Sequence, residues 1–544
     1  MTSPYRPARP HSAHRAGRVP AGGALLAAAL LLGAALAEPA AATAGQPASG
    51  LSRSALDWGA CPAPTPNANG SYYPRDPREQ CATLRVPRDY RQPGAGSITL
   101  TVSRIRTADP AHRLGDLVVV PGGPGGSGLD YPSQLLGILP AAVPASYDLI
   151  GFDERGVGNS TPVACGLSAA DRAAELNYPY PAPDGDISGN LAFAKRVADT
   201  CAATAGDYLG DISTADSARD LDRIRTALGV PKISYLGSSY GTYLGQIYAT
   251  MFAPHTDKVV LDSTVAPGGV EQGMSLYGLG TEQAFPALAA YLAQQDATLH
   301  LGATQTAVRA GYFRLAAKLD RTPLRLGDGR VLDGNGFRAL TFSVLTNAAY
   351  YPLAARAWQA ADTGVLPPPG PGGGSTLPTV IPDNFVAAQD AVICNDTPWP
   401  RDPGYYAAQT AADRIRYPLS NGMPGNVWPC AYWHYGPTEP PVRADPIGPR
   451  NILMLQNLKD PDTAYAGARQ TLSAFGHRAA MVTLEATGHG VDFADPKVAG
   501  PFTAFLLTGR LPTGNRSSCT GPPSRYSART RRPRGAPQAG VRQQ

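Results

Sequence analysis

Short apolar runs alternate with helical patterns over much of the chain, and this alternation predicts a mostly parallel sheet with helices on both faces. Residues 98–106 alternate apolar and polar side chains instead, which is typical of a half-exposed strand, and 81–87 read as its short antiparallel neighbour. The remaining apolar runs predict buried strands, and they lie at 117–120, 147–152, 258–262, 452–456 and 480–484. The pattern therefore favours the α/β class.

A helix is predicted over 214–228, where Ala218, Leu221, Ile224 and Leu228 fall on one face. Ser213 or Thr214 can cap its start, and Gly229 with Pro231 ends it. The helix leads directly into the apolar run that begins at Ile233. We therefore expect a strand–helix–strand unit, which places this run inside the parallel sheet.

The run at Ile233 breaks into a G-x-S-x-G segment, Gly237 to Gly241, and residues 242–249 then form a helical pattern. Strand, G-x-S-x-G and helix in this order are the pattern of a nucleophile elbow. The turn is so tight that side chains flanking the serine would collide with neighbouring backbone, so glycine is needed there. Ser239 is thus the candidate nucleophile, at a helix N-terminus that favours developing negative charge.

A glycine cluster at 121–128 follows the strand at 117–120 and predicts an oxyanion-binding loop. It lacks the G-K-[ST] ending of a phosphate-binding loop. The backbone N–H groups of Gly123 and Tyr240 are the candidate oxyanion donors. In the loop after the next strand, an ion pair between Asp153 and Arg155 is expected to fix the backbone beside the glycine cluster.

An unassisted serine hydroxyl needs a base, and the base needs an orienting anion. His489 alone among the later histidines directly follows a buried strand and lies between two glycines, which favours it over His255, His300, His434 and His477. Asp460 and Asp462 both follow the preceding strand, and we prefer Asp460 because a proline fixes the turn after it. The order Ser239, Asp460, His489 is the order of α/β-hydrolases.

The domain pattern changes between 266 and 445, where helical stretches at 282–292 and 305–319 occur without buried strands. We interpret this region as a largely helical cap, inserted as a lid over the site. The α/β-hydrolase core then comprises 58–265 and 446–515.

The ends of the chain predict export. Arginines precede an apolar run at 21–36, and residues 1–37 therefore resemble a signal peptide, with an uncleaved membrane anchor as the alternative. Residues 38–57 read as a flexible segment and 516–544 as a disordered basic tail, which accounts for much of the net charge of +5. No later stretch is long and apolar enough to span a bilayer, and no nucleic-acid surface is indicated.

Seven cysteines in an exported chain suggest disulfides. Sequential neighbours give plausible pairs, while the spacing alone leaves the connectivity open and leaves Cys519 over. The candidate pairs are Cys61–Cys81, Cys165–Cys201 and Cys394–Cys430.

The chain resembles the exported bacterial tripeptidyl aminopeptidases, relatives of the proline iminopeptidases. The resemblance rests on CATLRVP at 81–87, GGPGGSG at 122–128, DERGVGNS at 153–160, GSSYGTYLG at 237–245, DPDT at 460–463 and GHG at 488–490. It implies a secreted serine exopeptidase that removes short peptides from free N-termini without a metal or other cofactor, and it supports Asp460 as the acid. It specifies no oligomeric state.

This chain departs from the family pattern near the acid. Ala464 stands where proline is usual, Ser263 stands where glycine is more usual, and Gln456 and Asn457 replace small residues at a strand end. An aminopeptidase must also bind an ammonium group, for which a carboxylate in the cap is suited. The candidates are Glu271, Glu282, Asp390 and Asp396, each of which we interpret as a surface charge.

Two other functions share the fold. An esterase or lipase would use the same triad with a different cap, and this cap lacks an obvious long apolar stripe. A catalytically silent hydrolase fold would serve only for binding.

Overall fold

The computed structural model describes residues 56–66, 72, 74–175, 178–326, 331–367, 380–513 and the backbone of 516–518. Contacts divide the chain into 1–52 and 53–544, and every described residue belongs to the second unit. The expected signal peptide, nearly all of the segment 38–57, most of the basic tail and Cys519 lie outside the described residues.

In the described part of the chain, the main sheet has nine strands in the order β1-β2-β4-β3-β5-β6-β9-β10-β11. Strand β1 pairs antiparallel with β2, and β2 pairs antiparallel with β4. All other neighbours are parallel. The strands span Gln80–Pro87, Ser97–Ile105, Gly115–Val120 (β3), Tyr147–Phe152 (β4), Ile233–Ser238 (β5), Thr256–Asp262 (β6), Ile452–Lys459 (β9), Ala479–Thr487 (β10) and Arg516–Ser518 (β11).

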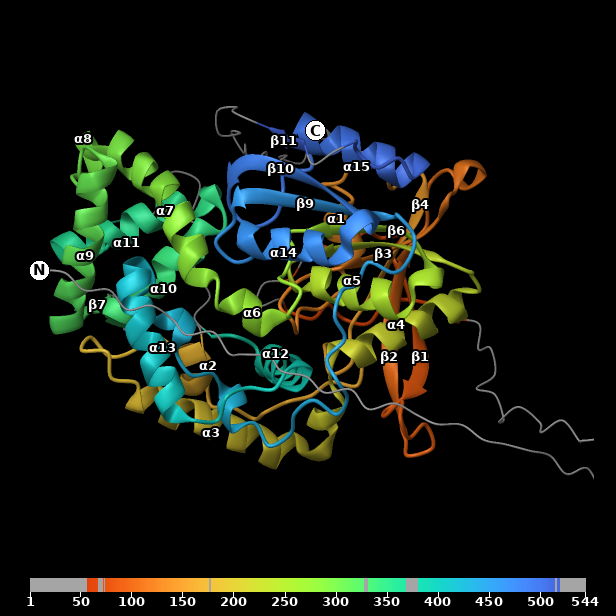
Figure 1. Cartoon of the computed structure of the whole chain (residues 1–544), viewed down its shortest axis with the longest axis horizontal. Coiled ribbons are helices and arrows are strands. Elements are labelled where there is room, and N and C mark those ends of the chain that lie inside the picture. Colours follow the sequence, from red (N-terminus) through yellow and green to blue (C-terminus); the bar gives the residue numbers. More distant parts are fainter. Residues whose placement is uncertain are drawn as a thin grey trace, which may run out of the picture. The chain divides into compact units, whose positions relative to one another are not determined.

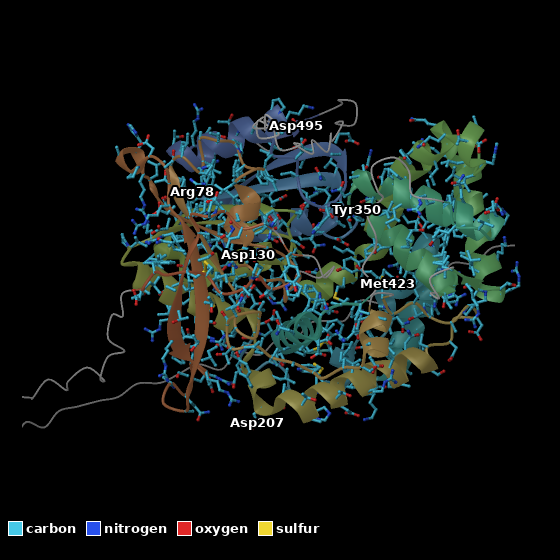
Figure 2. All side chains as sticks on the ribbon, turned by 180° about the vertical axis from the view of Figure 1, so that it is seen from behind. Arg78, Asp130, Asp207, Tyr350, Met423 and Asp495 are labelled. Atoms are coloured by element: carbon cyan, nitrogen blue, oxygen red, sulfur yellow. A yellow bond between two sulfur atoms is a disulfide. The ribbon has the colours of Figure 1, made fainter. Side chains whose placement is uncertain are left out.

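Apolar side chains on both faces explain why β3 is buried. Leu117 and Val119 join one core cluster, and the alternate residues Val118 and Val120 join another on the opposite face. Helices α1 (Tyr131–Leu135) and α15 (Pro496–Thr508) cover the first face, and α4 (Thr214–Leu228), α5 (Tyr240–Met251) and α14 (Tyr465–Phe475) cover the second (Figure 1). Helix α15 begins where the Asp495 side chain accepts the Lys497 N–H, at a position labelled in Figure 2. The α/β-hydrolase prediction is confirmed.

Between β6 and β9 the chain forms the cap, most of which is helical. Its longer helices pack around Phe285, Tyr312, Phe337 and Trp358, which form a core of their own beside the sheet (Figure 1). The helices are α6 (Val270–Met274), α7 (Tyr277–Gln294), α8 (Asp296–Leu299), α9 (Gln305–Arg321), α10 (Gly334–Leu345), α11 (Tyr351–Thr363), α12 (Asp383–Asp396) and α13 (Pro403–Arg416). A short hairpin that the sequence did not reveal, β7 (Leu324–Arg325) and β8 (Val331–Leu332), interrupts them.

Helix α12 belongs to the cap in sequence and to the core in space. Val386, Ala391 and Cys394 are buried in the same cluster as the sheet. At its start, the Asn384 amide donates to the carbonyl oxygens of Gly156 and Val163, both at 2.7 Å. This helix therefore ties the cap to the core.

Other helices connect these parts. They are α2 (Ala169–Glu175), α3 (Ser188–Ala205) and the 3₁₀ segments Pro110–His112, Gly206–Asp211, Ala253–His255, Ala348–Tyr350, Pro418–Ser420, Met423–Gly425, Pro429–Tyr432 and Gly476–Arg478. Within the described ranges, no helix is both long and apolar enough to cross a bilayer.

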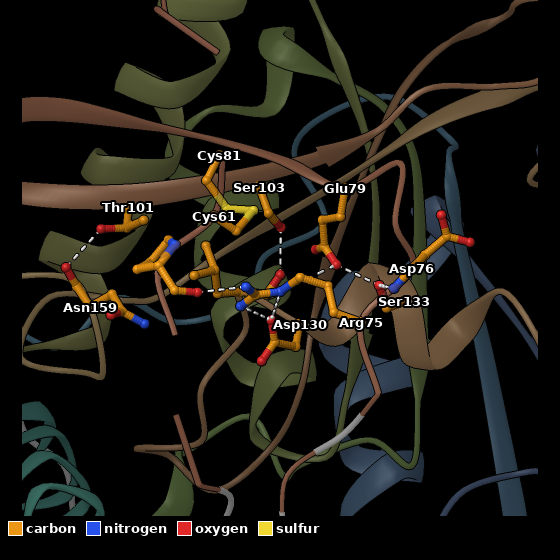
Figure 3. Close-up of a disulfide and its surroundings, with 12 residues drawn as sticks. Cys61, Arg75, Asp76, Glu79, Cys81, Thr101, Ser103, Asp130, Ser133 and Asn159 are labelled. Atoms are coloured by element: carbon orange, nitrogen blue, oxygen red, sulfur yellow. Dashed lines mark hydrogen bonds and ion pairs between the residues drawn. A yellow bond between two sulfur atoms is a disulfide. The ribbon is translucent and has the colours of Figure 1, made fainter. Parts of the chain in front are cut away.

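Within the residues that the structure describes, three disulfides form, and they are the three candidate pairs, Cys61–Cys81, Cys165–Cys201 and Cys394–Cys430. Figure 3 shows the first pair beside an ion pair in which the Arg75 Nε donates to Asp130 at 2.7 Å. Asp130 lies two residues after the glycine cluster and directly precedes α1. The disulfide therefore attaches the N-terminal segment to β1, and the ion pair attaches it to the end of that loop.

Candidate active site

Ser239 lies at the turn between β5 and α5, as the elbow pattern predicts. Its backbone has φ 55° and ψ −126°, a conformation unusual for a non-glycine residue. A Cβ on Gly237 would stand 2.2 Å from the Gly241 oxygen, and one on Gly241 would stand 2.5 Å from the Pro121 oxygen. Glycine is therefore required on both sides of the serine, because any side chain would meet backbone.

The glycine loop at 121–128 lies directly against the serine. A Cβ on Gly122 would stand 2.5 Å from the Ser239 Cβ and 2.8 Å from its Oγ. From the other side α12 packs on the loop, since the Phe385 carbonyl oxygen is 2.6 Å from where a Gly125 Cβ would be. The Gly123 backbone is thus confined between the nucleophile turn and α12. Tyr240 is the first residue of α5, where a backbone N–H has no partner within the helix.

Asp153 holds the glycine loop, although not through the predicted ion pair with Arg155. The Asp153 carboxylate, fully buried, accepts hydrogen bonds from the Ser127 hydroxyl at 2.6 Å and from the backbone N–H groups of Leu129 and Asn159 at 3.0 and 2.7 Å. Burial raises the pKa of Asp153, although these hydrogen bonds act to lower it. Three donors already occupy this carboxylate.

Arg155 instead forms a buried ion pair with Asp220 of α4. Its Nε and Nη2 donate to the two Asp220 oxygens, both at 2.8 Å, in a bidentate arrangement. Its Nη1 donates to the carbonyl oxygens of Arg88 and Asp211. The predicted Asp153–Arg155 pair is therefore wrong, because a helix distant in sequence supplies the better acceptor.

His489 and Asp460 are in direct contact. The Nδ1 atom of His489 lies 3.0 Å from Asp460 Oδ2 and 3.1 Å from Oδ1, so the ring donates its N–H to the carboxylate. The Asp460 side chain is fully buried, and it also accepts the backbone N–H groups of Asp462 and Thr463, each at 2.9 Å. No such bond joins His489 to Asp462 among the described residues, so the geometry favours Asp460 as the orienting acid.

The charges of three carboxylates act on the imidazole. Burial alone would lower the pKa of His489, but the charges of Asp460, Asp462 and Asp262 together raise it to about 10. Burial also raises the pKa of Asp262 to about 7 and that of Asp462 to about 6. The sequence analysis did not single out Asp262. Its place at the end of a buried strand, β6, is the signal that could have identified it.

The other histidines after Ser239 take no part in this contact. His255 bonds to Asp222 at 2.6 Å, and the half-exposed His434 bonds to Asp199 at 2.8 Å. His477 precedes β10 and so lies at the opposite edge of the sheet from His489. The described residues contain no group of three or more His, Cys, Asp or Glu side chains that could hold a metal ion.

The cap carboxylates differ in their surroundings. Glu282 pairs with Arg309 at 2.9 Å, and Asp396 accepts the Thr214 N–H at 2.8 Å, while Glu271 is half-buried. Asp390 is only 4% exposed, so its interpretation as a surface charge is wrong. It lies on the face of α12 that turns into the protein.

Matches to family models cover both parts of the core. Residues 117–359 match the model described as the alpha/beta hydrolase fold, and residues 419–519 match the model described as TAP-like protein. Together with the parallel sheet, the elbow and the His489–Asp460 contact, these matches define an α/β-hydrolase, an enzyme of the serine hydrolase class.

The sequences of similar proteins identify the family to which this α/β-hydrolase belongs. A tripeptidyl aminopeptidase of Streptomyces lividans is 32% identical, covering 79% of this chain and 82% of that protein. Carboxylesterase B of Mycobacterium tuberculosis is also 32% identical, over 80% of this chain and 85% of its own length. Serine protease Hip1 of M. tuberculosis is 29% identical, over 79% and 86%. The chain belongs to the tripeptidyl aminopeptidase family.

Proposed function

We propose that this protein is a secreted serine exopeptidase that releases short peptides, most often tripeptides, from free N-termini. The observation that carries the proposal is the contact between the His489 Nδ1 and the buried Asp460 carboxylate, in a chain whose G-x-S-x-G turn carries Ser239. The S. lividans relative named tripeptidyl aminopeptidase supports the substrate class.

In the proposed mechanism, Ser239 Oγ attacks the carbonyl carbon of the scissile bond and His489 takes its proton as general base. Asp460 holds the imidazole in the tautomer with Nδ1 protonated and stabilises the imidazolium that forms. The backbone N–H groups of Gly123 and Tyr240 bind the oxyanion. His489 then protonates the leaving amine, and water hydrolyses the acyl-enzyme in the reverse sequence of proton transfers.

A buried carboxyl pair fits the ammonium group of such a substrate. Asp390 Oδ2 and Glu175 Oε1 are buried atoms without a hydrogen-bond partner in the described structure. Burial raises the pKa of Asp390 to about 7, and burial followed by the charge of Asp390 raises the pKa of Glu175. Gln389, the residue before Asp390, lies beside the glycine loop, since its N atom is 3.2 Å from where a Gly125 Cβ would be. A cation with several N–H donors would satisfy both groups.

Replacing Asp390 tests this binding role. We expect Asp390→Asn to lower kcat/KM for peptides with a free N-terminus by roughly tenfold to a hundredfold, because a hydrogen bond to a charged group contributes about 1.5–3 kcal/mol. Glu282→Gln is the matched control, since that cap carboxylate is already paired with Arg309. Equal losses for N-acetylated and free peptides would exclude Asp390 as the ammonium site.

The second candidate function is ester hydrolysis, which the M. tuberculosis relative named carboxylesterase B favours. Purified protein should be given a peptide panel with free and acetylated N-termini, with products identified by mass spectrometry, and short p-nitrophenyl esters in parallel. We expect N-terminal tripeptides from the free peptides only. Ester turnover without any peptide turnover would reject the exopeptidase.

A fluorophosphonate probe separates both enzymes from a silent binding fold. We expect the probe to label the wild type and to leave Ser239→Ala unlabelled. An unlabelled wild type would favour the silent fold.

Export is proposed on two grounds. The N-terminal pattern of arginines and an apolar run is that of a signal peptide, and three disulfides form within the described residues. Structural disulfides persist in oxidising compartments. N-terminal sequencing of protein collected from the culture medium tests the proposal, with cleavage expected after Ala37. Protein retained in the cytosol with thiols free would contradict it.

A further inference from the structure

His489 lies in a loop, residues 488–491, that we call the histidine loop. It follows β10, and its first N–H, that of Gly488, still donates to the Lys459 oxygen of β9 at 3.2 Å, while the backbone groups beyond it need other partners. Its glycines, Gly488 and Gly490, have φ of 125° and 85°. Side chains and backbone carbonyls from three separate segments supply the hydrogen bonds that hold it.

Asn457, at the end of β9, holds both peptide carbonyls that flank the histidine. Its Nδ2 donates to the Gly488 oxygen at 2.9 Å and to the Gly490 oxygen at 2.8 Å. The side chain is 3% exposed, so no water competes readily for these bonds. One amide thereby fixes the peptide plane just before His489 and the plane between Gly490 and Val491.

Ser263 holds the next N–H of the loop at a cost in backbone strain. Its Oγ accepts the Gly490 N–H at 2.8 Å, while its own φ is 59°, in the region that favours glycine. A strained serine where glycine would fit without strain indicates that the hydroxyl is needed.

Asp262 links the histidine loop to the nucleophile turn. Its carboxylate accepts the Val491 N–H at 3.0 Å, and its backbone carbonyl accepts the Ser239 N–H, also at 3.0 Å. The end of β6 therefore contacts the segment that carries the nucleophile and the segment that carries the base.

We propose that Asp262, Ser263 and Asn457 form a clamp that sets the position of His489 relative to Ser239, and that they act as positioning residues for the hydrolysis. The proposal rests on the proposed function only in taking Ser239 as nucleophile and His489 as base. None of the three side chains needs to touch substrate. Loss of the clamp should therefore lower kcat and leave KM almost unchanged.

The first test compares Ser263→Gly with Ser263→Ala. Both variants remove the hydroxyl, but only glycine also relieves the strain at positive φ. We expect kcat for p-nitrophenyl acetate and the rate of fluorophosphonate labelling to fall in both by roughly tenfold to a hundredfold, as misplacement of a catalytic group predicts. The Tm of Ser263→Gly should be no lower than that of Ser263→Ala. Full activity of Ser263→Gly would overturn the clamp.

A second test separates positioning from stability. Asn451, just before β9, is a buried asparagine whose Nδ2 donates to Thr256 Oγ1 at 2.9 Å and to the Asp257 oxygen at 2.8 Å, at the opposite end of the strand from Asn457. We expect Asn457→Leu and Asn451→Leu to lower Tm to a similar extent. Only Asn457→Leu should lower kcat of the folded enzyme.

The outcomes distinguish this inference from the proposed function. A wild type that cleaves the ester and no peptide rejects the exopeptidase while the clamp is still measured on the ester. Equal loss of kcat in Asn457→Leu and Asn451→Leu overturns the clamp and leaves the exopeptidase intact. A wild type that neither hydrolyses the ester nor reacts with the fluorophosphonate overturns both.

Discussion

Replacing Asp460 by asparagine should remove most of the catalytic rate and leave the fold in place. Asparagine keeps an oxygen at the Oδ1 position, which accepts the N–H groups of Asp462 and Thr463 at 2.9 Å each. What it loses is the negative charge beside His489, and it gains an NH₂ group where Oδ2 lies 3.0 Å from Nδ1. That NH₂ would donate to the ring and favour the tautomer that cannot act as a base toward Ser239.

The expected size follows from the observed separation. Two unit charges 3.0 Å apart interact by about 5.5 kcal/mol at an effective dielectric constant of about 20. Above about pH 10, where His489 is neutral in the free enzyme, that energy is the stabilisation the imidazolium loses in the transition state, and it corresponds to a factor of about 10⁴ in rate. We therefore expect kcat at that pH to fall by about 10⁴ and the thermal midpoint to change little.

Asp462→Asn is the matched control, because Asp462 is a half-buried neighbour without a hydrogen bond to the ring among the described residues. We expect it to lower kcat by less than about tenfold, since only a longer-range charge effect is lost. The assay is steady-state hydrolysis of a tripeptide anilide, with circular dichroism melting as the check on folding. If Asp462→Asn lost as much activity as Asp460→Asn, the assignment of the acid would be refuted.

Four further predictions concern the nucleophile, the base and the core. Gly122→Ala would place a methyl group 2.5 Å from the Ser239 Cβ, so we expect fluorophosphonate labelling to be lost, and a normal labelling rate would contradict the close approach. Nearby carboxylates raise the pKa of His489 to about 10, so kcat/KM should increase with pH up to that value. Asp262→Asn should shift this increase to lower pH. A pH profile of kcat/KM that is flat above pH 7 would disprove the prediction. The same raised pKa adds stability that is complete below about pH 6.5 and is lost as pH rises through about 10, which denaturant titration at several pH values measures. Arg155→Met leaves the Asp220 carboxylate buried without its cation and should lower the free energy of unfolding by about 3–5 kcal/mol, with partial recovery in Arg155→Met/Asp220→Asn; a loss below about 1 kcal/mol would show the pair to be dispensable.

Sequence reasoning succeeded where the determinant is local. The elbow is encoded in five consecutive residues, since Gly237 and Gly241 are needed wherever a strand turns at once into a helix. The contact between His489 and Asp460 was predictable because each residue follows a buried strand, and parallel strands end at the same edge of a sheet. The three disulfides join cysteines that are neighbours in sequence.

Sequence reasoning failed where a contact joins elements that are distant in the sequence. Arg155 was assigned to Asp153, two residues away, because the chain alone does not show that α4 brings Asp220 against it. Asp390 was interpreted as a surface charge because α12 has polar residues on several sides and its packing against the sheet is a tertiary fact. Ser263 and Asn457 were seen only as departures from a family pattern, and their hydrogen bonds to the histidine loop explain what those departures do.

The last turn of α10 carries a consequence for engineering. The Thr346 carbonyl, which belongs to the cap, accepts the His489 N–H at 2.8 Å. A chimera that keeps this sheet but receives the cap of another protein would therefore retain the nucleophile, Ser239. It would lose one of the hydrogen bonds that hold the proposed base, His489. A cap exchanged to change the substrate range would have to preserve the Thr346 carbonyl oxygen. Directed evolution of this scaffold should therefore start from the short segment around Thr346.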